Sequence, residues 1–185
     1  MIVCRLIGGV ELGATVWLTG LPSSGKSTLA AGLAARLSGR RRVAVLDGDV
    51  IRRDLFPELG FSKDDRTENV RRTGIVARLL AAQGVLVIAP VIAPYIAARE
   101  VVRRDHHDHG LGYFEIFVDA AAEICAERDV KGLYARAKRG EIAGLTGFDD
   151  PYEPPLQPDL HLRTDQLSVP ECLDRMIRFV GTTAR

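Results

Sequence analysis

The nine residues from Gly20 to Thr28 constrain the fold of this chain more than any other stretch. Their sequence, Gly-Leu-Pro-Ser-Ser-Gly-Lys-Ser-Thr, fits the pattern G-x-x-x-x-G-K-[ST] of a phosphate-binding loop, or P-loop. Such a loop places glycines where the backbone approaches phosphate oxygens, a lysine on the β- and γ-phosphates, and a hydroxyl on Mg²⁺. We therefore expect the phosphates of ATP to be bound by Gly20, Ser23, Ser24, Gly25, Lys26, Ser27 and Thr28.

The residues on either side of this loop indicate whether the motif is a true P-loop or a chance match. Before it, residues 15–19 are β-branched and apolar enough for a buried parallel strand. After it, Leu29, Leu33 and Leu37 recur four residues apart, which is typical of one face of a helix. The alternative is a Gly/Ser surface turn before an ordinary helix, but the order of strand, loop and helix favours a P-loop.

Four more apolar runs predict strands at residues 43–46, 85–89, 113–118 and 160–162. Helical patterns occupy residues 28–37, 50–55, 64–83, 96–104, 121–127, 131–141 and 169–180. This alternation predicts an α/β fold: a three-layer, doubly wound domain with a mostly parallel five-stranded sheet, of the P-loop NTPase and nucleotide kinase type. Because the chain has 185 residues, we expect a single domain, with residues 1–13 as an N-terminal edge strand or extension.

The composition argues against several other classes of protein. A net charge of +1 gives no reason to expect a nucleic-acid or membrane partner, and no segment has the roughly 18 uncharged apolar residues of a membrane span. Cys4, Cys125 and Cys172 are odd in number and lack C-x-x-C spacing, which argues against a disulfide framework and a zinc site. A reducing, cytoplasmic setting is the simplest expectation.

Two carboxylates, Asp47 and Asp49, follow the second predicted strand. Ligands gather at the carboxyl ends of parallel strands, so both should face the P-loop. The third strand lacks the terminal aspartate of a Walker B motif, so Ser27 with Asp49 is the expected Mg²⁺ pair. The alternative for these aspartates is a helix N-cap or an Asx turn.

A cluster of histidines and aspartates lies near residue 106, where His106, His107 and His109 accompany Asp105 and Asp108. Its composition resembles a metal site. However, adjacent residues of a helix point apart, and Gly110 follows at once. We therefore interpret the cluster as a solvated helix end.

Residues 131–158 are expected to form a lid. Residues 131–141 are rich in cations, and residues 144–158 are rich in Gly, Pro and Asp and are unusually long for a simple connection. A mobile cationic cover excludes water from phosphoryl transfer, as a kinase requires. The guanine-reading string N-K-x-D does not occur in the sequence, so a small-molecule kinase is favoured over a switch-type GTPase.

Several longer strings are more specific than the P-loop. They are Leu46-Asp47-Gly48-Asp49, Leu59-Gly60-Phe61-Ser62, and residues 65–72, 131–134 and 147–153. With these strings the chain closely resembles adenylylsulfate kinase (APS kinase) from about residue 14 to residue 180. The resemblance implies transfer of the γ-phosphate of ATP to the 3′-hydroxyl of adenosine 5′-phosphosulfate (APS), giving PAPS and ADP in sulfate activation.

The resemblance also implies which residues contact APS: Asp49, Arg52, Phe61, Arg66, Asn69, Ile92, Lys131, Leu133, Phe148 and Tyr152. Guanidinium groups suit phosphate and sulfate oxygens, and aromatic faces suit a purine. For catalysis we expect Lys26 to stabilise the γ-phosphate, Asp49 to accept or orient the hydroxyl proton, and Asp47 to support Asp49. The expected cations near ATP are Arg128 and either Arg136 or Arg139.

Two residues depart from the pattern of the family. Ala93 stands where many members have serine, and Ile96 where they have arginine, so no phosphoenzyme can form at position 93. These changes leave open a related kinase for another sulfated, sulfamoylated or phosphoramidate nucleotide. A non-catalytic nucleotide-binding regulator is a third hypothesis, which the intact P-loop argues against. The family resemblance further suggests a homodimer and an association with ATP sulfurylase.

Overall fold

The centre of the fold is a five-stranded sheet with the strand order β4-β5-β3-β6-β7, in which all neighbouring strands are parallel. The computed structural model describes residues 6–7, 10–11 and 13–183. The strands are β3 (Ala14–Thr19), β4 (Val43–Val45), β5 (Leu86–Pro90), β6 (Gly112–Asp119) and β7 (Leu160–Arg163). The five predicted strands and the doubly wound α/β fold are thus confirmed.

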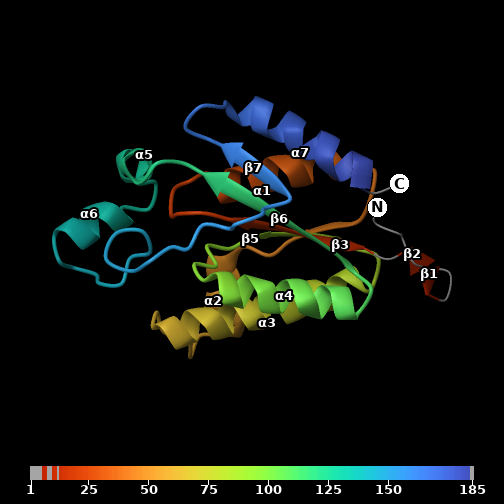
Figure 1. Cartoon of the computed structure of the whole chain (residues 1–185), viewed down its shortest axis with the longest axis horizontal. Coiled ribbons are helices and arrows are strands. Elements are labelled where there is room, and N and C mark those ends of the chain that lie inside the picture. Colours follow the sequence, from red (N-terminus) through yellow and green to blue (C-terminus); the bar gives the residue numbers. More distant parts are fainter. Residues whose placement is uncertain (1–5, 8–9, 12, 184–185) are drawn as a thin grey trace.

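Helices cover both faces of this sheet and make it the middle of three layers (Figure 1). They are α1 (Lys26–Leu37), α2 (Gly48–Leu55), α3 (Lys63–Ala81), α4 (Ile96–Asp108), α5 (Ala122–Arg128), α6 (Leu133–Lys138) and α7 (Val169–Thr183). Helices α1 and α7 pack on one face, and α2, α3 and α4 on the other. None of these helices has the length and apolar character needed to cross a membrane.

Strand β3 shows why a largely apolar run predicts a central strand. Val16 and Leu18 point to the core shared with α1 and α7, whereas Trp17 points to the core shared with α3 and α4. All three side chains are fully buried. A strand with both faces covered is mostly apolar, and the two buried threonines of β3, Thr15 and Thr19, have hydrogen-bond partners. Strand β3 lies between β5 and β6.

The predicted N-terminal edge strand or extension, residues 1–13, is described only in part. Strands β1 (Leu6–Ile7) and β2 (Val10–Glu11) pair with each other, antiparallel, in a separate two-stranded sheet. The edges of the main sheet are β4 and β7. The remaining residues of the predicted extension, 1–5, 8–9 and 12, lie outside the described part of the chain.

The interpretation of the histidine cluster as a solvated helix end was wrong for His106. This side chain is fully buried between α4 and β3, where its Nε2 lies 2.9 Å from the Thr15 hydroxyl and its Nδ1 2.9 Å from the Val102 carbonyl oxygen. Burial lowers the pKa of His106. Helix α4 continues four residues beyond the predicted end, and His106 occupies its sheet-facing side. His107 and His109 are exposed as expected, and no metal-binding cluster occurs among the described residues.

Candidate active site

A cavity of about 530 Å³ lies at the carboxyl edge of the sheet. Its walls come from the segments that follow β3, β4, β5, β6 and β7, with further residues from α3. The sequence-predicted residues that line it are Ser23, Ser24, Gly25, Lys26, Ser27, Thr28, Asp47, Asp49, Arg52, Phe61, Arg66, Asn69, Ile92, Arg128, Lys131 and Leu133. One space therefore joins the P-loop to most of the residues expected to hold an acceptor.

The P-loop connects β3 to α1 through two residues in the left-handed region, Ser23 (φ 62°) and Gly25 (φ 103°). Gly25 is the N-cap of α1, so the unpaired N–H groups at the start of this helix lie at the cavity wall. Gly20 is also under a steric constraint, and its contact with phosphate stays a prediction. It does not line the cavity, and a Cβ at this position would overlap the Val118 carbonyl oxygen. Because Gly20 has no side chain, the first residue of the P-loop can lie directly against the backbone of β6.

Lys26 turns its ammonium group onto the loop itself. Its Nζ donates to the carbonyl oxygens of Gly20 (2.9 Å) and Leu21 (2.7 Å). Burial lowers the pKa of Lys26 to about 7, although the nearby Asp49 carboxylate acts in the opposite direction. At neutral pH the Lys26 side chain is therefore only partly protonated, and a bound anion would favour its charged form.

Binding of a nucleotide is expected to take up a proton at Lys26. Near pH 8 the lysine of the free protein is mostly neutral, because its pKa is about 7, and phosphate oxygens favour the charged form. Calorimetry of nucleotide binding in buffers of different ionisation enthalpy should show close to one proton bound per site at pH 8 and clearly less at pH 6. The same titration of Lys26→Met corrects for protons exchanged by the nucleotide. Equal uptake by the variant would contradict the assignment to Lys26.

Asp47 and Asp49 begin α2 and have different partners. Asp47 is the N-cap of α2, as the alternative interpretation proposed, and accepts from the backbone N–H of Asp49 (3.0 Å). The Ser27 hydroxyl donates to Asp47 Oδ2 (3.1 Å). Asp49 pairs instead with Lys131, which comes from the segment between α5 and α6. In this structure the carboxylate that touches Ser27 is therefore Asp47, and pairing of Ser27 with Asp49 through a metal stays a prediction.

The opposite wall of the cavity carries an aromatic ring between two cations. The guanidinium carbons of Arg52 and Arg66 lie 4.8 Å and 5.6 Å from the centre of the Phe61 ring, which is 67% exposed. Burial, with the charge of Arg66, lowers the pKa of Arg52. Asn69 is 4% exposed, and its Oδ1 has no hydrogen-bond partner among the described residues. A buried unpaired oxygen of this kind indicates a place for a ligand donor.

Arg66 also reaches the predicted lid. Its Nη1 donates to the Thr146 hydroxyl (3.0 Å), its Nη2 to the Gly144 carbonyl, and its Nε lies 3.6 Å from Asp150 Oδ2. The segment between α6 and β7 is therefore tied to the start of α3 by one buried guanidinium.

Comparison with known proteins identifies the family to which a chain with this site belongs. The family described as Adenylylsulphate kinase matches residues 12–163. This match covers most of the chain, including the P-loop and the wall formed by Arg52, Phe61 and Arg66. The chain belongs to the adenylylsulfate kinase family.

Individual adenylylsulfate kinases match over nearly their full length. The adenylyl-sulfate kinase of Chloroflexus aurantiacus is 52% identical over 167 residues, which cover 89% of this chain and 87% of that protein. That of Paraburkholderia xenovorans is 50% identical over 178 residues, covering 94% and 96%. The APS kinase CysC of Mycobacterium tuberculosis, solved with AMPPNP and APS, is 44% identical, with a TM-score of 0.88 and coverage of 92% and 98%. The resemblance to adenylylsulfate kinase that the sequence motifs indicated is thus confirmed.

Four residues proposed from the adenylylsulfate kinase resemblance or from lid charge do not line the cavity. Arg136 and Arg139 pair with Glu141, at 3.6 Å and 2.5 Å. Phe148 lines a separate, shallow depression on the lid, and Tyr152, which also lines it, stacks on Phe117. The structure does not bring these side chains to the site, so their contacts with substrate stay predictions. Arg128 does line the cavity, where its Nη2 donates to the Thr164 carbonyl oxygen (2.7 Å).

One wall of the cavity was missed by sequence reasoning. It is formed by the turn after β7 and the start of α7, with Thr164, Leu167, Ser168, Val169 and Cys172. The Thr164 hydroxyl donates to the Ser24 carbonyl oxygen (2.8 Å) and ties this wall to the P-loop. A signal was present in the sequence, because a polar turn follows the fifth predicted strand at the edge where ligands gather in this family's fold.

Proposed function

We propose that this chain phosphorylates the 3′-hydroxyl of APS with ATP, giving PAPS and ADP. One observation carries the proposal: a single cavity joins a P-loop to the Arg52–Phe61–Arg66 wall and to the unpaired, buried Oδ1 of Asn69. The first part suits a nucleoside triphosphate, and the second suits an aromatic, anionic acceptor. The similarity to adenylylsulfate kinases of nearly the same length supports this pairing of substrates.

The protein acts mainly by positioning and charge. The N–H groups at the start of α1 bind the ATP phosphates, and Lys26 leaves the Gly20 and Leu21 carbonyls to meet the γ-phosphate. On the other wall, Arg52, Arg66 and Asn69 orient APS against Phe61. Asp49 then accepts or orients the proton of the attacking 3′-hydroxyl, once Lys131 has released it. The lid excludes water, which would compete for the phosphoryl group.

The residues beside the P-loop fit Mg²⁺. Ser27, Asp47 and Asp49 offer a hydroxyl and two carboxylates at the cavity wall, a set of oxygen donors that this ion prefers. When bound, Mg²⁺ would neutralise charge on the β- and γ-phosphates. We propose that Ser27 and Asp49 hold it, with Asp47 as the resting partner of Ser27.

The two departures from the family pattern have unequal weight. Ala93 lines the cavity, whereas the side chain of Ile96 does not. The change at position 93 therefore lies in the cavity wall, and an assay with APS tests the combined effect of both changes on the choice of acceptor. Purified protein with Mg-ATP and APS should form ADP and PAPS with an efficiency of at least roughly 10⁴ M⁻¹s⁻¹, and none without APS. Efficiency orders of magnitude lower would favour the other acceptors, and ATP binding without turnover would favour a regulator.

Restoring the family serine at position 93 is expected to change little. Ala93 is buried in the left-handed region (φ 45°), and direct transfer needs no hydroxyl there. For Ala93→Ser we expect kcat/KM for APS within about threefold of the parent, less than the effect of one ordinary hydrogen bond. Steady-state assays with varied APS measure this ratio. A gain well above that range would mean that the serine contributes to acceptor binding in this family.

We further propose a homodimer in a cytoplasmic setting and an association with ATP sulfurylase. The family resemblance supports the dimer and the partner, and the free, buried thiols of Cys125 and Cys172 suit a reducing compartment. Light scattering of the purified chain, alone and mixed with ATP sulfurylase, tests both assemblies. A monomer that does not change mass in the mixture would contradict them.

A further inference from the structure

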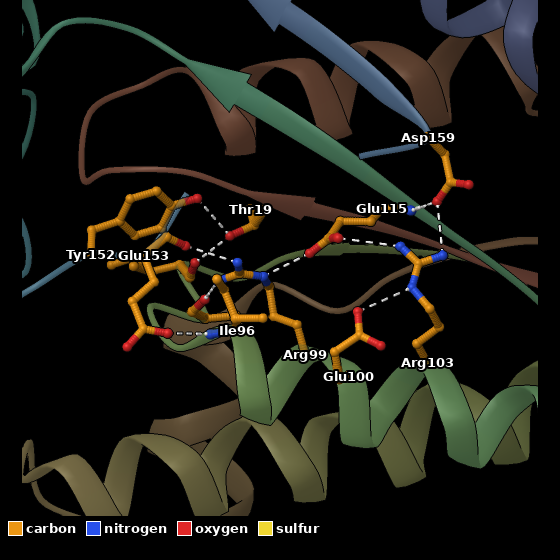
Figure 2. A network of polar contacts seen from close by, with 11 residues as sticks. Thr19, Ile96, Arg99, Glu100, Arg103, Glu115, Tyr152, Glu153 and Asp159 are labelled. Atoms are coloured by element: carbon orange, nitrogen blue, oxygen red, sulfur yellow. Dashed lines mark hydrogen bonds and ion pairs between the residues drawn. The ribbon is translucent and has the colours of Figure 1, made fainter. Parts of the chain in front are cut away.

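Arg99 is a buried cation that lies behind the cavity and not in its wall. It is on the first turn of α4, its side chain is 2% exposed, and it is not among the lining residues. Figure 2 shows its guanidinium at the centre of a polar network that joins α4, β6, the loop after β5 and the end of the lid. The N–H groups of a buried guanidinium need hydrogen-bond acceptors. The acceptors that Arg99 contacts therefore indicate which parts of the structure it holds together.

The first partner of Arg99 is a carboxylate on the central sheet. Its Nε lies 2.7 Å from Glu115 Oε1, and Glu115, on β6, is 5% exposed. Arg103 supports the same carboxylate from the next turn of α4, with Nη2 3.2 Å from Glu115 Oε2. A buried ion pair recovers little more than its desolvation cost, so stability alone does not account for this arrangement. The pair instead anchors the guanidinium of Arg99 to the rigid sheet.

The second partner is the backbone of the loop that forms the acceptor side of the cavity. The Nη1 of Arg99 donates to the Ala93 carbonyl oxygen (2.6 Å). Ala93 has a φ of 45°, a conformation that is strained for alanine and persists only where the surroundings hold it. Residues 91–94 all line the cavity, so this hydrogen bond fixes part of the cavity wall from behind.

The third partner is the end of the lid. The Nη2 of Arg99 donates to the Glu153 carbonyl oxygen (2.8 Å). Glu153 is joined to the same loop twice more: its N–H donates to the Pro94 carbonyl (2.8 Å), and its carboxylate accepts from the Ile96 N–H (2.7 Å) at the start of α4. The lid and the loop after β5 therefore share one junction, with Arg99 at its centre (Figure 2).

Thr19 ties this junction to the strand that leads into the P-loop. Its hydroxyl donates to the Ile92 carbonyl oxygen (2.6 Å) and lies 2.9 Å from the Tyr152 hydroxyl. Tyr152 is thus occupied within the junction, next to Glu153, which explains why it lies outside the cavity. The end of β3, the loop after β5 (residues 91–94, here called the acceptor loop) and the end of the lid meet within one hydrogen-bonded network.

We propose that Arg99 is a positioning residue for the acceptor: it holds residues 91–94 in a strained conformation and locks them to the lid at Glu153, without touching either substrate. The inference rests on the proposed phosphorylation of APS. It predicts that weakening Arg99 impairs use of the acceptor and leaves use of ATP unchanged, because the P-loop is held by other contacts. A purely structural role would impair both substrates alike.

Arg99→Lys is the sharpest test of this role. Lysine keeps the positive charge beside Glu115 but lacks the fork needed to reach Ala93 and Glu153 together. We expect KM for APS to rise by at least about tenfold, with KM for ATP within about twofold, since small displacements of a binding wall carry large kinetic costs. Steady-state assays with each substrate varied in turn measure this difference.

Arg103→Lys is the matched control. Arg103 lies on the same helix and shares Glu115, but its other partners are Glu100, Asp159 and the Tyr113 ring, none of which belongs to residues 91–94 or to Glu153. We expect both KM values to stay near those of the parent, even if the melting temperature falls. An equal rise in KM for APS in the two lysine variants would overturn the proposal.

Glu153→Ala tests the junction without altering the buried ion pair. It removes the carboxylate that accepts from the Ile96 N–H, and it should raise KM for APS in the same direction as Arg99→Lys. Hydrogen exchange gives a readout that does not depend on turnover: the amides of Ile96 and Glu153 should exchange faster in Arg99→Lys than in Arg103→Lys. Unchanged exchange would overturn the inference. A parent protein that fails to use APS would instead overturn the proposed function.

Discussion

Asp49→Asn is expected to lower kcat by about 10²- to 10⁴-fold, the usual contribution of a positioned general base. Asparagine keeps the size of the side chain and its place at the start of α2 but cannot accept a proton. The affinity for ATP should fall far less than kcat, because the N–H groups of the P-loop and Lys26 remain and only one proposed Mg²⁺ ligand loses its charge. Rapid-quench measurement of a single turnover, with calorimetry of ATP binding, separates the two quantities.

Asp47→Asn is the control for this substitution. Asparagine caps helices about as well as aspartate, so α2 should keep its start. If Asp47 only supports the site, its loss of charge should cost clearly less activity than that of Asp49. A larger loss for Asp47→Asn would reverse the assignment, and the contact between the Ser27 hydroxyl and Asp47 Oδ2 would then mark the main metal carboxylate.

Lys26→Met is expected to reduce kcat by about 10²- to 10³-fold or more, the cost of removing one preorganised group that stabilises transition-state charge. Methionine retains the length and the burial of the side chain, while the charge that meets the γ-phosphate is lost. The loss should exceed any weakening of ATP binding, because charge on the transferred group grows in the transition state. Steady-state kcat and the Kd for ATP measure the two effects.

Lys138→Met is the control for the lysine substitution. Lys138 is exposed near the end of α6 and does not line the cavity. Its removal should leave kcat and the Kd for ATP near the parent values. Comparable losses in both lysine variants would point to a general effect of lid and surface charge instead of a specific role for Lys26.

The fold could be predicted because parallel strands that are covered on both faces leave an unmistakable pattern. Strands β3 and β5 are apolar at nearly every position, and α1 repeats leucine every four residues. His106 could not be predicted, because its burial depends on a partner 91 residues away, the Thr15 hydroxyl. Sequence pattern alone gives no sign of such a distant polar pair.

The candidate site was predicted where chemistry and sequence motif coincide. Residues from the P-loop, from α2 and from the start of α3 line the cavity as expected. The wall at Thr164 was missed because it enters the site only through the placement of β7 beside β6, a neighbour relation that sequence order does not state. For Phe148 and Tyr152 the opposite happened, because the sequence predicted a contact with the site that the structure does not show. The motif places both residues in the lid, but it does not determine the direction in which their rings point.

Three polar or charged side chains on the P-loop side have internal partners in the resting protein. Lys26 bonds to loop carbonyls, Ser27 to Asp47, and Asp49 to Lys131. Substrate binding therefore exchanges one set of contacts for another, and the affinity measures only the difference between them. The strength of these resting contacts therefore helps to set the affinity for substrate. Strengthening the ion pair between Lys131 and Asp49, or removing it by replacing Lys131, would shift this affinity without altering any atom that touches the transferred phosphate.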